Sequence, residues 1–120
     1  MKRKKLKIGR IAIEAEVADN LFSMAKGLML RESLEKNRGM LFTFPIEGHH
    51  SIWMFGMRFP IDIIWMDRDM RVVDIYENAS PCIIFCKVYM PKKRAKYVLE
   101  VNSGFVKNHK IKLGTKISGI

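Results

Sequence analysis

"IDIIWMDRDMRVVDIYE", residues 61–77, contains two strand-like segments separated by a short polar turn. The first segment is apolar except for Asp62, and the second alternates between apolar and polar side chains. The charged residues 67–69 between them are typical of a tight turn. This stretch therefore predicts an antiparallel hairpin whose first strand is buried.

The rest of the chain repeats this pattern of short strands. Further strands are predicted over residues 10–18, 40–44, 50–55, 82–90 and 96–101, and residues 115–120 can add a last one. Two short helices are expected: one over about 20–28, capped by Asp19 or Asn20, and one within 102–110, capped by Asn102 or Ser103. About seven short strands and two short helices predict a small, mainly antiparallel α+β domain that forms a partly closed barrel.

The 120 residues carry a net charge of +10, which is concentrated at the two ends of the chain. Residues 1–10 hold six basic groups and no acid, and residues 87–120 hold nine basic groups with Glu100 as the only acid. We therefore expect a basic N-terminal arm over residues 1–10 and one globular domain over 11–120. The basic ends favour, as an alternative function, an accessory nucleic-acid-binding protein. Its candidate residues are Lys2, Arg3, Lys4, Lys5, Lys92, Lys93, Arg94 and Lys96.

The sequence predicts a cytoplasmic protein without membrane association. Glu14 and Glu16 interrupt the segment that would be the apolar part of a signal peptide, and no apolar run is long enough to span a bilayer. The chain has no Gln but 14 Lys and 14 Ile, a composition typical of a hyperthermophilic source.

Cys82 and Cys86 are the two cysteines of the chain. If both lie on one strand, their positions are about 13 Å apart, which is too far for a disulfide. Two buried thiols are therefore predicted, although a loop around Cys82 would allow a bridge.

Asp62 is the most informative polar residue, because it lies between two isoleucines in a buried strand. A buried carboxylate needs a partner, and Arg31 and Arg58 are the candidates. Such an ion pair fixes a loop against a strand, or it leaves Arg31 to hold an anionic ligand. Together with Trp53, these residues form the predicted ligand-binding site.

His49, His50 and Met54 are a second, alternative site, because histidine and methionine together suit Cu(I). His49 and His50 also follow a predicted turn, where exposed histidines are common, and methionine also fills cores. No nucleophile–base arrangement or phosphate-binding loop is visible, so enzymatic activity stays open and no cofactor is expected.

Three motifs resemble a known family. They are "KGLMLRESLEKNRGMLFTFP" (26–45), "WM…PIDIIWMDRDMRVVDIYENASPC" (53–82) and "A.YVLEV..G" (95–104). In this order they resemble domain-of-unknown-function family 192, also called uncharacterised protein family 0127. The resemblance implies no established activity. Many relatives read "WMKNT" where this chain has "WMFGM", so a Lys–Asn–Thr site does not transfer to it.

The leading hypothesis from the sequence is a non-enzymatic binding module. It would present a pocket near Arg31, Trp53 and Asp62 to a small ligand or an acidic protein partner. The nucleic-acid binder is the second hypothesis, and a small enzyme or soft-metal protein is the third.

Overall fold

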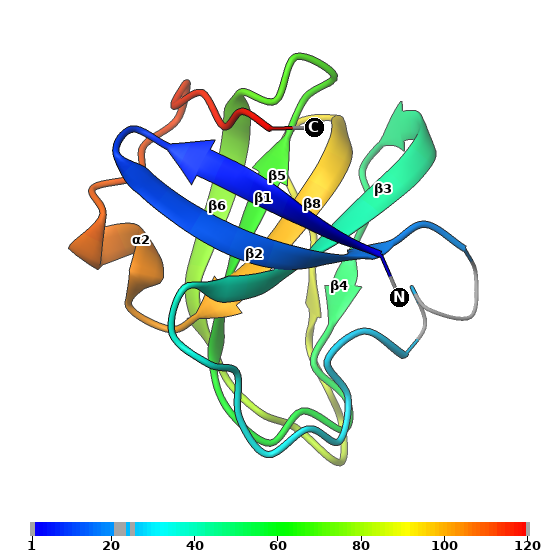
Figure 1. The fold of residues 1–120 in the computed structure, drawn as a ribbon. Helices are drawn as coiled ribbons and strands as arrows, with labels where there is room; N and C mark the ends of the chain where they lie inside the picture. The colour runs from blue at the N-terminus through cyan, green and yellow to red at the C-terminus, as the bar shows by residue number, and fades with distance from the viewer. Residues whose placement is uncertain (1, 21–23, 25, 120) are drawn as a thin grey trace.

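A computed structural model describes residues 2–20, 24 and 26–119. Its main element is a six-stranded sheet with the strand order β1-β2-β3-β8-β5-β6, accompanied by the two-stranded sheet β4-β7 (Figure 1). The strands are β1 Arg3–Ile8, β2 Ile11–Ala18, β3 Arg38–Gly48, β4 Ile52–Trp53, β5 Ile61–Met66, β6 Val72–Ala79, β7 Val88–Tyr89 and β8 Ala95–Asn102. All neighbouring strands are antiparallel except β2 and β3, so the predicted mainly antiparallel β domain is confirmed.

The predicted hairpin is present as β5 and β6, with Ile64 opposite Ile75. Asp67 stabilises the turn, because its Oδ1 accepts hydrogen bonds from the backbone N–H groups of Asp69 and Arg71, at 2.9 and 3.0 Å. All six residues of β5 are buried, as the apolar run predicted. The reason is that β5 lies inside the sheet, between β6 and β8.

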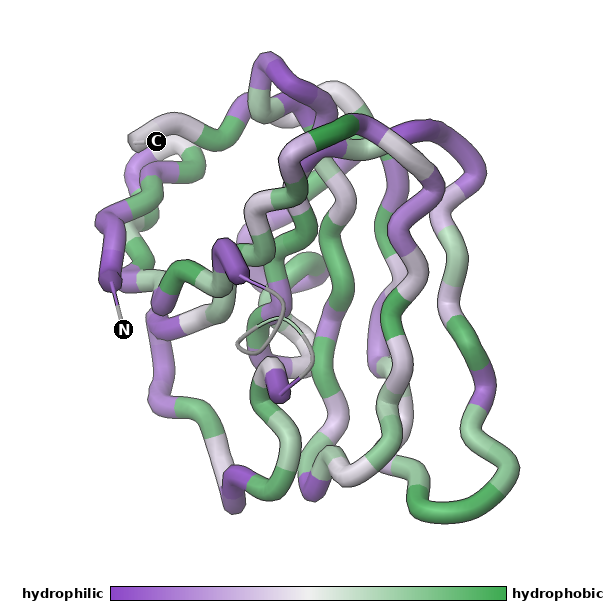
Figure 2. Tube along the Cα trace, turned by 90° about the vertical axis from the view of Figure 1, so that its right-hand side faces the viewer, coloured by the Kyte–Doolittle hydropathy of each residue, from purple (hydrophilic) through white to green (hydrophobic). Residues whose placement is uncertain are grey.

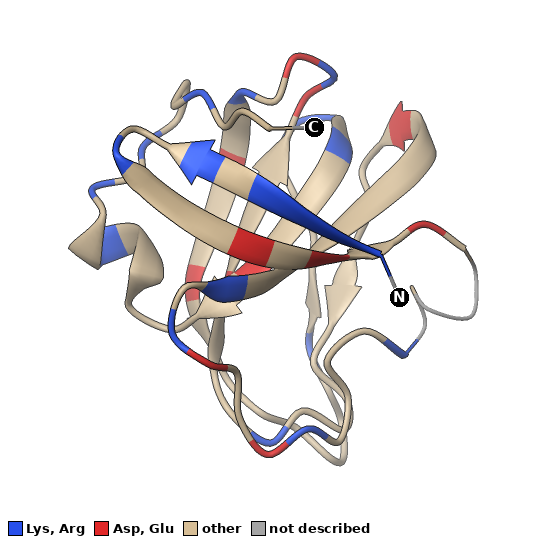
Figure 3. Ribbon diagram, viewed as in Figure 1, with Lys and Arg blue, Asp and Glu red and all other residues tan. Residues whose placement is uncertain are grey.

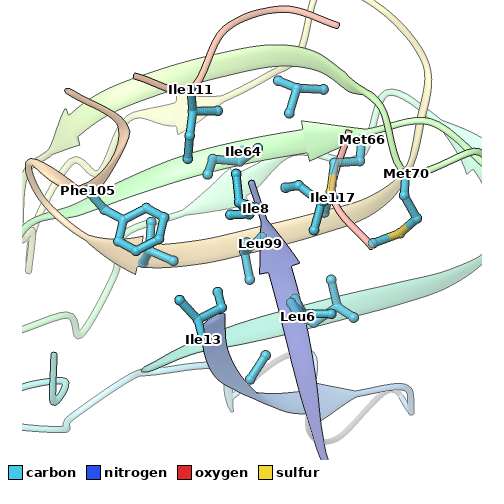
Figure 4. Close-up of a cluster of buried hydrophobic side chains, with 14 of the residues drawn as sticks. Leu6, Ile8, Ile13, Ile64, Met66, Met70, Leu99, Phe105, Ile111 and Ile117 are labelled. Carbon is cyan, nitrogen blue, oxygen red and sulfur yellow. The ribbon is translucent and has the colours of Figure 1, made fainter. Parts of the chain in front are cut away.

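Each face of the sheet carries its own hydrophobic core. The first core joins Leu6, Ile8 and Ile13 of β1 and β2 to Leu99 and other residues of the central strands (Figure 4). The second core lies on the opposite face. It contains Met40, Phe42, Ile63, Trp65 and Val98 from the main sheet, together with Ile52, Met54, Met57 and Tyr89. Central strands are therefore covered on both faces.

The predicted closure of the sheet and the predicted cap of the second helix are wrong. The sheet is not closed into a barrel, because β1 and β6 remain its two separate edges. The short helix predicted within 102–110 is present as α2 Phe105–Asn108. Its N-cap is Gly104, with φ 94°, and not Asn102 or Ser103. The other helix was expected over about 20–28, and its residues 21–23 and 25 lie outside the described ranges.

Several strands have other bounds than predicted. Residues 3–8, which were expected in a basic arm, form strand β1 instead, because Leu6 and Ile8 alternate with lysines and are buried. Of the strand predicted over 82–90, only Val88–Tyr89 pairs as β7. In place of the last strand predicted over 115–120, Lys116 and Ser118 each form an isolated β-bridge, and residue 120 lies outside the described ranges. No helix in the described ranges has the length and hydropathy needed to cross a membrane.

Candidate functional site

A groove of about 660 Å³ opens on the face of the sheet that carries the second core. Its volume lies in the range of pockets that hold small molecules. The lining is mostly apolar and rich in methionine and aromatic side chains. It consists of Met24, Lys26, Gly27, Leu28, Met29, Phe42, Phe44, Pro45, Ser51, Ile52, Trp53, Phe55, Met57 and Glu100.

The bend after β4 shapes one wall of this groove. Trp53 is 58% exposed, and its ring stacks on Phe55 at a centroid distance of 5.0 Å. Gly56 has φ +76° and lies so close to Met29 that an added Cβ would be 2.4 Å from Met29 Cγ. Its carbonyl accepts a hydrogen bond of 2.8 Å from the N–H of Leu30. A glycine is therefore needed where the bend meets the segment containing Met29.

Glu100 is the polar group of the groove that the sequence did not reveal. It lies on the central strand β8, between Met40 of β3 and Ile63 of β5, and is only 4% exposed. No side chain or backbone group of the described residues forms a hydrogen bond or ion pair with its carboxyl group. No side-chain oxygen among these residues is both fully buried and unpaired, so this carboxyl group reaches the open space of the groove.

Burial raises the pKa of Glu100 from its ordinary value of 4.5 to about 8, because little water is available to solvate the charged form. The carboxyl group is therefore mostly protonated at neutral pH and can donate a hydrogen bond. The signal in the sequence was a single acid inside the apolar run "YVLEV". Recognising it required the knowledge that β8 is a central strand covered on both faces.

The predicted pairing of Asp62 with an arginine is wrong. Asp62 is fully buried, and its Oδ1 accepts a hydrogen bond from the N–H of Asn78 at 2.9 Å. Its Oδ2 accepts from the N–H groups of Gly104 and Val106, at 3.1 and 2.9 Å. Three backbone donors thus satisfy this carboxylate. Asp62 aligns with Val101 of the first core, on the face of the sheet opposite the groove.

Arg31 pairs with Glu16 instead. Both guanidinium nitrogens Nη1 and Nη2 donate to the Glu16 carboxylate, with 3.0 Å between Nη2 and Oε1. The hydrogen bond from Arg31 lowers the pKa of Glu16. Glu16 aligns with Met40 and therefore lies on the same face of the sheet as Glu100. The pKa values of these two carboxyl groups are nevertheless shifted in opposite directions. Arg58 is exposed, and no described residue forms an ion pair with it.

The histidines and Met54 lie in different surroundings. The ring of His50 stacks on Phe44 at 3.7 Å, and its Nε2 lies 2.7 Å from the carbonyl oxygen of Ile46. His49 is exposed, whereas Met54 is buried in the second core. Within the described ranges, no three His, Cys, Asp or Glu side chains are grouped so that they could hold a metal ion.

Cys82 and Cys86 form a disulfide, so the prediction of two buried thiols is wrong. The segment between them is a loop and not a strand, which brings the two Cα atoms to 5.5 Å. Both cysteines are partly exposed.

The basic candidates are spread over the molecule (Figure 3). Lys4 and Lys5 lie on the edge strand β1, beside a second, shallow hollow of about 460 Å³. The backbone N–H of Lys92 binds Asp74 of β6, the strand at the other edge of the sheet. Lys96 and Arg94 donate to the carbonyl groups of Phe44 and Glu47, at 2.7 and 2.9 Å. The two basic segments therefore do not form one continuous patch within the main sheet.

These features define a class of protein: a small, mainly β domain with an open sheet and an apolar groove of ligand size. The chain belongs to the DUF192 family, described as "Uncharacterized ACR", which matches residues 4–119. The resemblance seen in the sequence motifs is thereby confirmed.

Relatives of this chain come from thermophilic archaea, in agreement with the composition. A UPF0127 protein of Thermococcus gammatolerans is 36% identical over 105 residues, which are 86% of this chain and 64% of that protein. A UPF0127 protein of Pyrococcus abyssi is 34% identical over 109 residues, covering 89% of this chain and 86% of that protein. The chain thus spans slightly less than two thirds of the Thermococcus protein.

Two solved structures are similar along nearly the whole chain. One, from Sinorhizobium meliloti, is described as a "putative transcription regulator"; it has a TM-score of 0.92 and 27% identity and covers 98% of this chain and 94% of that chain. The other is a protein of unknown function from Novosphingobium aromaticivorans, with a TM-score of 0.87 and 29% identity, covering 97% and 83%.

Proposed function

We propose that this protein is a non-enzymatic binding module for a small, mostly apolar ligand that occupies the groove beside Trp53. The unpartnered carboxyl group of Glu100 in an otherwise apolar lining carries this proposal. Apolar pockets with a few converging polar groups are the usual form of small-molecule sites. In its protonated form, Glu100 would donate a hydrogen bond to an acceptor oxygen of the ligand.

A binding role is favoured over catalysis by the composition of the lining. A buried acid with a raised pKa is common in active sites, because it can transfer protons near neutral pH. Lys26 is the only other ionisable side chain among the described residues that line the groove. Among these described lining residues, no nucleophile–base pair accompanies Glu100. The cytoplasm remains the proposed location, where a disulfide suits a thermophilic source.

The anionic dye 8-anilinonaphthalene-1-sulfonate tests this proposal, because it combines apolar rings with acceptor oxygens. We expect its fluorescence to rise on binding at pH 7 and its affinity to fall as the pH rises through about 8. When Glu100 loses its proton, it can no longer donate a hydrogen bond to the dye, and its negative charge repels the sulfonate group. Glu100→Gln should keep the affinity at pH 7 and abolish this decrease, and decanoate should displace the dye.

A pair of serine-to-tryptophan variants, one inside the groove and one outside it, tests whether the dye binds there. Ser51 lines the groove, so Ser51→Trp should reduce dye affinity at least about tenfold by steric exclusion. Ser33 is exposed outside the groove, and Ser33→Trp should leave the affinity unchanged. Equal affinity of the two variants, or a pH dependence that survives Glu100→Gln, would refute the proposal.

The Sinorhizobium structure favours nucleic-acid binding as a second candidate function. The exposed lysines of β1 would contact phosphates, so binding of duplex DNA should weaken steeply as salt increases. Lys4→Gln combined with Lys5→Gln should reduce the salt slope by about two. The matched pair Lys107→Gln and Lys112→Gln should not change it. Fluorescence anisotropy measures both slopes, and equal slopes would exclude β1 as the interface.

A further inference from the structure

The loop closed by the disulfide presents three consecutive apolar side chains to solvent. Ile83 and Ile84 are 77% and 71% exposed, and Phe85 is fully exposed. Figure 2 shows this loop as the apolar segment that projects at the lower right of the molecule. Exposed apolar side chains in such a run usually mark an interaction site. Water is a poor environment for all three.

The structure holds this tip in place. The disulfide joins its two ends, and Phe85 has φ 56°, a backbone conformation that is uncommon for a bulky residue. The N–H of Gly56 donates to the carbonyl oxygen of Cys82 at 3.0 Å, which ties the tip to the bend beside the groove. The exposure of the tip is therefore part of a defined loop conformation.

Aromatic side chains and Lys87 surround the base of the tip. Lys87 Nζ lies 4.9 and 5.0 Å from the ring centroids of Tyr76 and Tyr89, and it donates a hydrogen bond to the Tyr76 hydroxyl. Trp53 is exposed next to Phe55, and the backbone of Phe55 forms an isolated β-bridge with Cys82. Lys87 is exposed and brings positive charge to the base of the tip. Tyrosine, tryptophan and lysine are the residues found where protein meets the boundary between lipid and water.

We propose that the loop 82–86 docks this protein onto an anionic lipid surface by inserting Ile83, Ile84 and Phe85. Lys87 at the base of the tip complements anionic headgroups, and three side chains at a projecting loop suit insertion better than a flat protein interface. This departs from our expectation of no membrane association, which considered only spanning segments. Docking would also place the groove, walled by Phe55, next to the lipid surface.

Co-sedimentation with vesicles tests this proposal. We expect the full chain to bind vesicles of phosphatidylcholine mixed with phosphatidylglycerol more tightly than vesicles of phosphatidylcholine alone. The combined change Ile83→Ser, Ile84→Ser and Phe85→Ser should lower the partition coefficient at least about tenfold. The combined change Ile46→Ser and Leu113→Ser, at exposed apolar residues elsewhere, is the control and should have little effect.

Tryptophan emission gives a second readout. Trp65 is buried, so a blue shift on adding vesicles would report that exposed Trp53 enters the lipid boundary, and Trp53→Phe should abolish it. Glu100→Gln should remove the pH dependence of dye binding but leave vesicle binding intact. The failure of the lipid proposal can therefore be distinguished from the failure of the proposed groove function. Equal partitioning of the tip variant and the control variant would overturn the proposal. So would self-association without vesicles that the tip variant loses, because the tip would then bind a second copy.

Discussion

Replacing Asp62 with alanine is expected to lower the free energy of unfolding by about 4 kcal/mol. The carboxylate accepts three backbone hydrogen bonds in a fully buried position. Its removal leaves three N–H donors without partners, and each buried unpaired donor costs about 1–3 kcal/mol. Denaturation in guanidinium chloride, followed by tryptophan fluorescence, measures the change.

The large effect has a structural origin. The first N–H groups of a helix have no partner within the helix, and α2 obtains one from a carboxylate 44 residues earlier in the chain. Asp62 also holds Asn78 at the end of β6, so a single side chain connects β5, β6 and α2. A change here should therefore destabilise the whole domain and not only one turn.

Two further variants test this explanation. Asp62→Asn keeps one acceptor oxygen but turns an NH₂ group toward backbone donors, so an intermediate loss of about 2 kcal/mol is expected. Asp69 is exposed, and Asp69→Ala should change the stability by less than about 0.5 kcal/mol. If Asp62→Ala costs no more than Asp69→Ala, the three hydrogen bonds do not contribute as argued.

Glu100→Gln is expected to stabilise the protein at alkaline pH. The pKa of Glu100 rises from 4.5 in the unfolded chain to about 8 in the folded one. Between these values the unfolded chain binds fewer protons, so the free energy of unfolding falls by about 1.4 kcal/mol for each pH unit. The loss begins near pH 4.5, is complete above about pH 8, and amounts to about 4–5 kcal/mol.

Glutamine carries no titrating proton, so the variant should lack this decrease. The two proteins should differ little near pH 4.5, and the variant should be several kcal/mol more stable at about pH 9. Chemical denaturation across this pH range gives the free energy of unfolding of each protein against pH. Subtracting one curve from the other removes the contribution of the titrating groups that both proteins share. A constant difference across the range would show that Glu100 ionises normally in the folded protein.

Glu16 provides a control with the opposite sign. Its pKa is lowered by the hydrogen bond from Arg31, so it contributes stability that is present above the unfolded pKa and is lost as the pH falls. Glu16→Gln should therefore destabilise the protein at neutral pH and have less effect in acid. The two carboxyl groups lie on one face of the sheet, so their opposite pKa shifts come from their different surroundings: an arginine partner for Glu16 and burial for Glu100.

A residue that destabilises the fold at its central strand needs an explanation. A leucine or methionine at position 100 would remove the cost of burying a carboxyl group, because the neighbouring second core is apolar. Functional sites are where proteins retain such unfavourable groups. The groove beside Glu100 accounts for it if the carboxyl group contacts a ligand there, which is the proposed function.

The sequence by itself determined the local structure of the sheet. The apolar run of β5, the turn at Asp67 and the alternation in β2 are short-range signals, because a strand places alternate side chains on opposite faces. The family motifs were also visible without a structure. The alternation in β1 was equally present, but the density of lysines led to the expectation of an arm.

Only the tertiary structure decided how the ionisable groups and the cysteines are used. Asp62 binds donors 16 to 44 residues away, Arg31 pairs with Glu16 across 15 residues, and Glu100 is buried by strands from elsewhere in the chain. The disulfide forms because residues 82–86 leave the strand conformation. Local periodicity encodes which face a side chain occupies, whereas its partner and its solvation depend on which distant segments pack against that face.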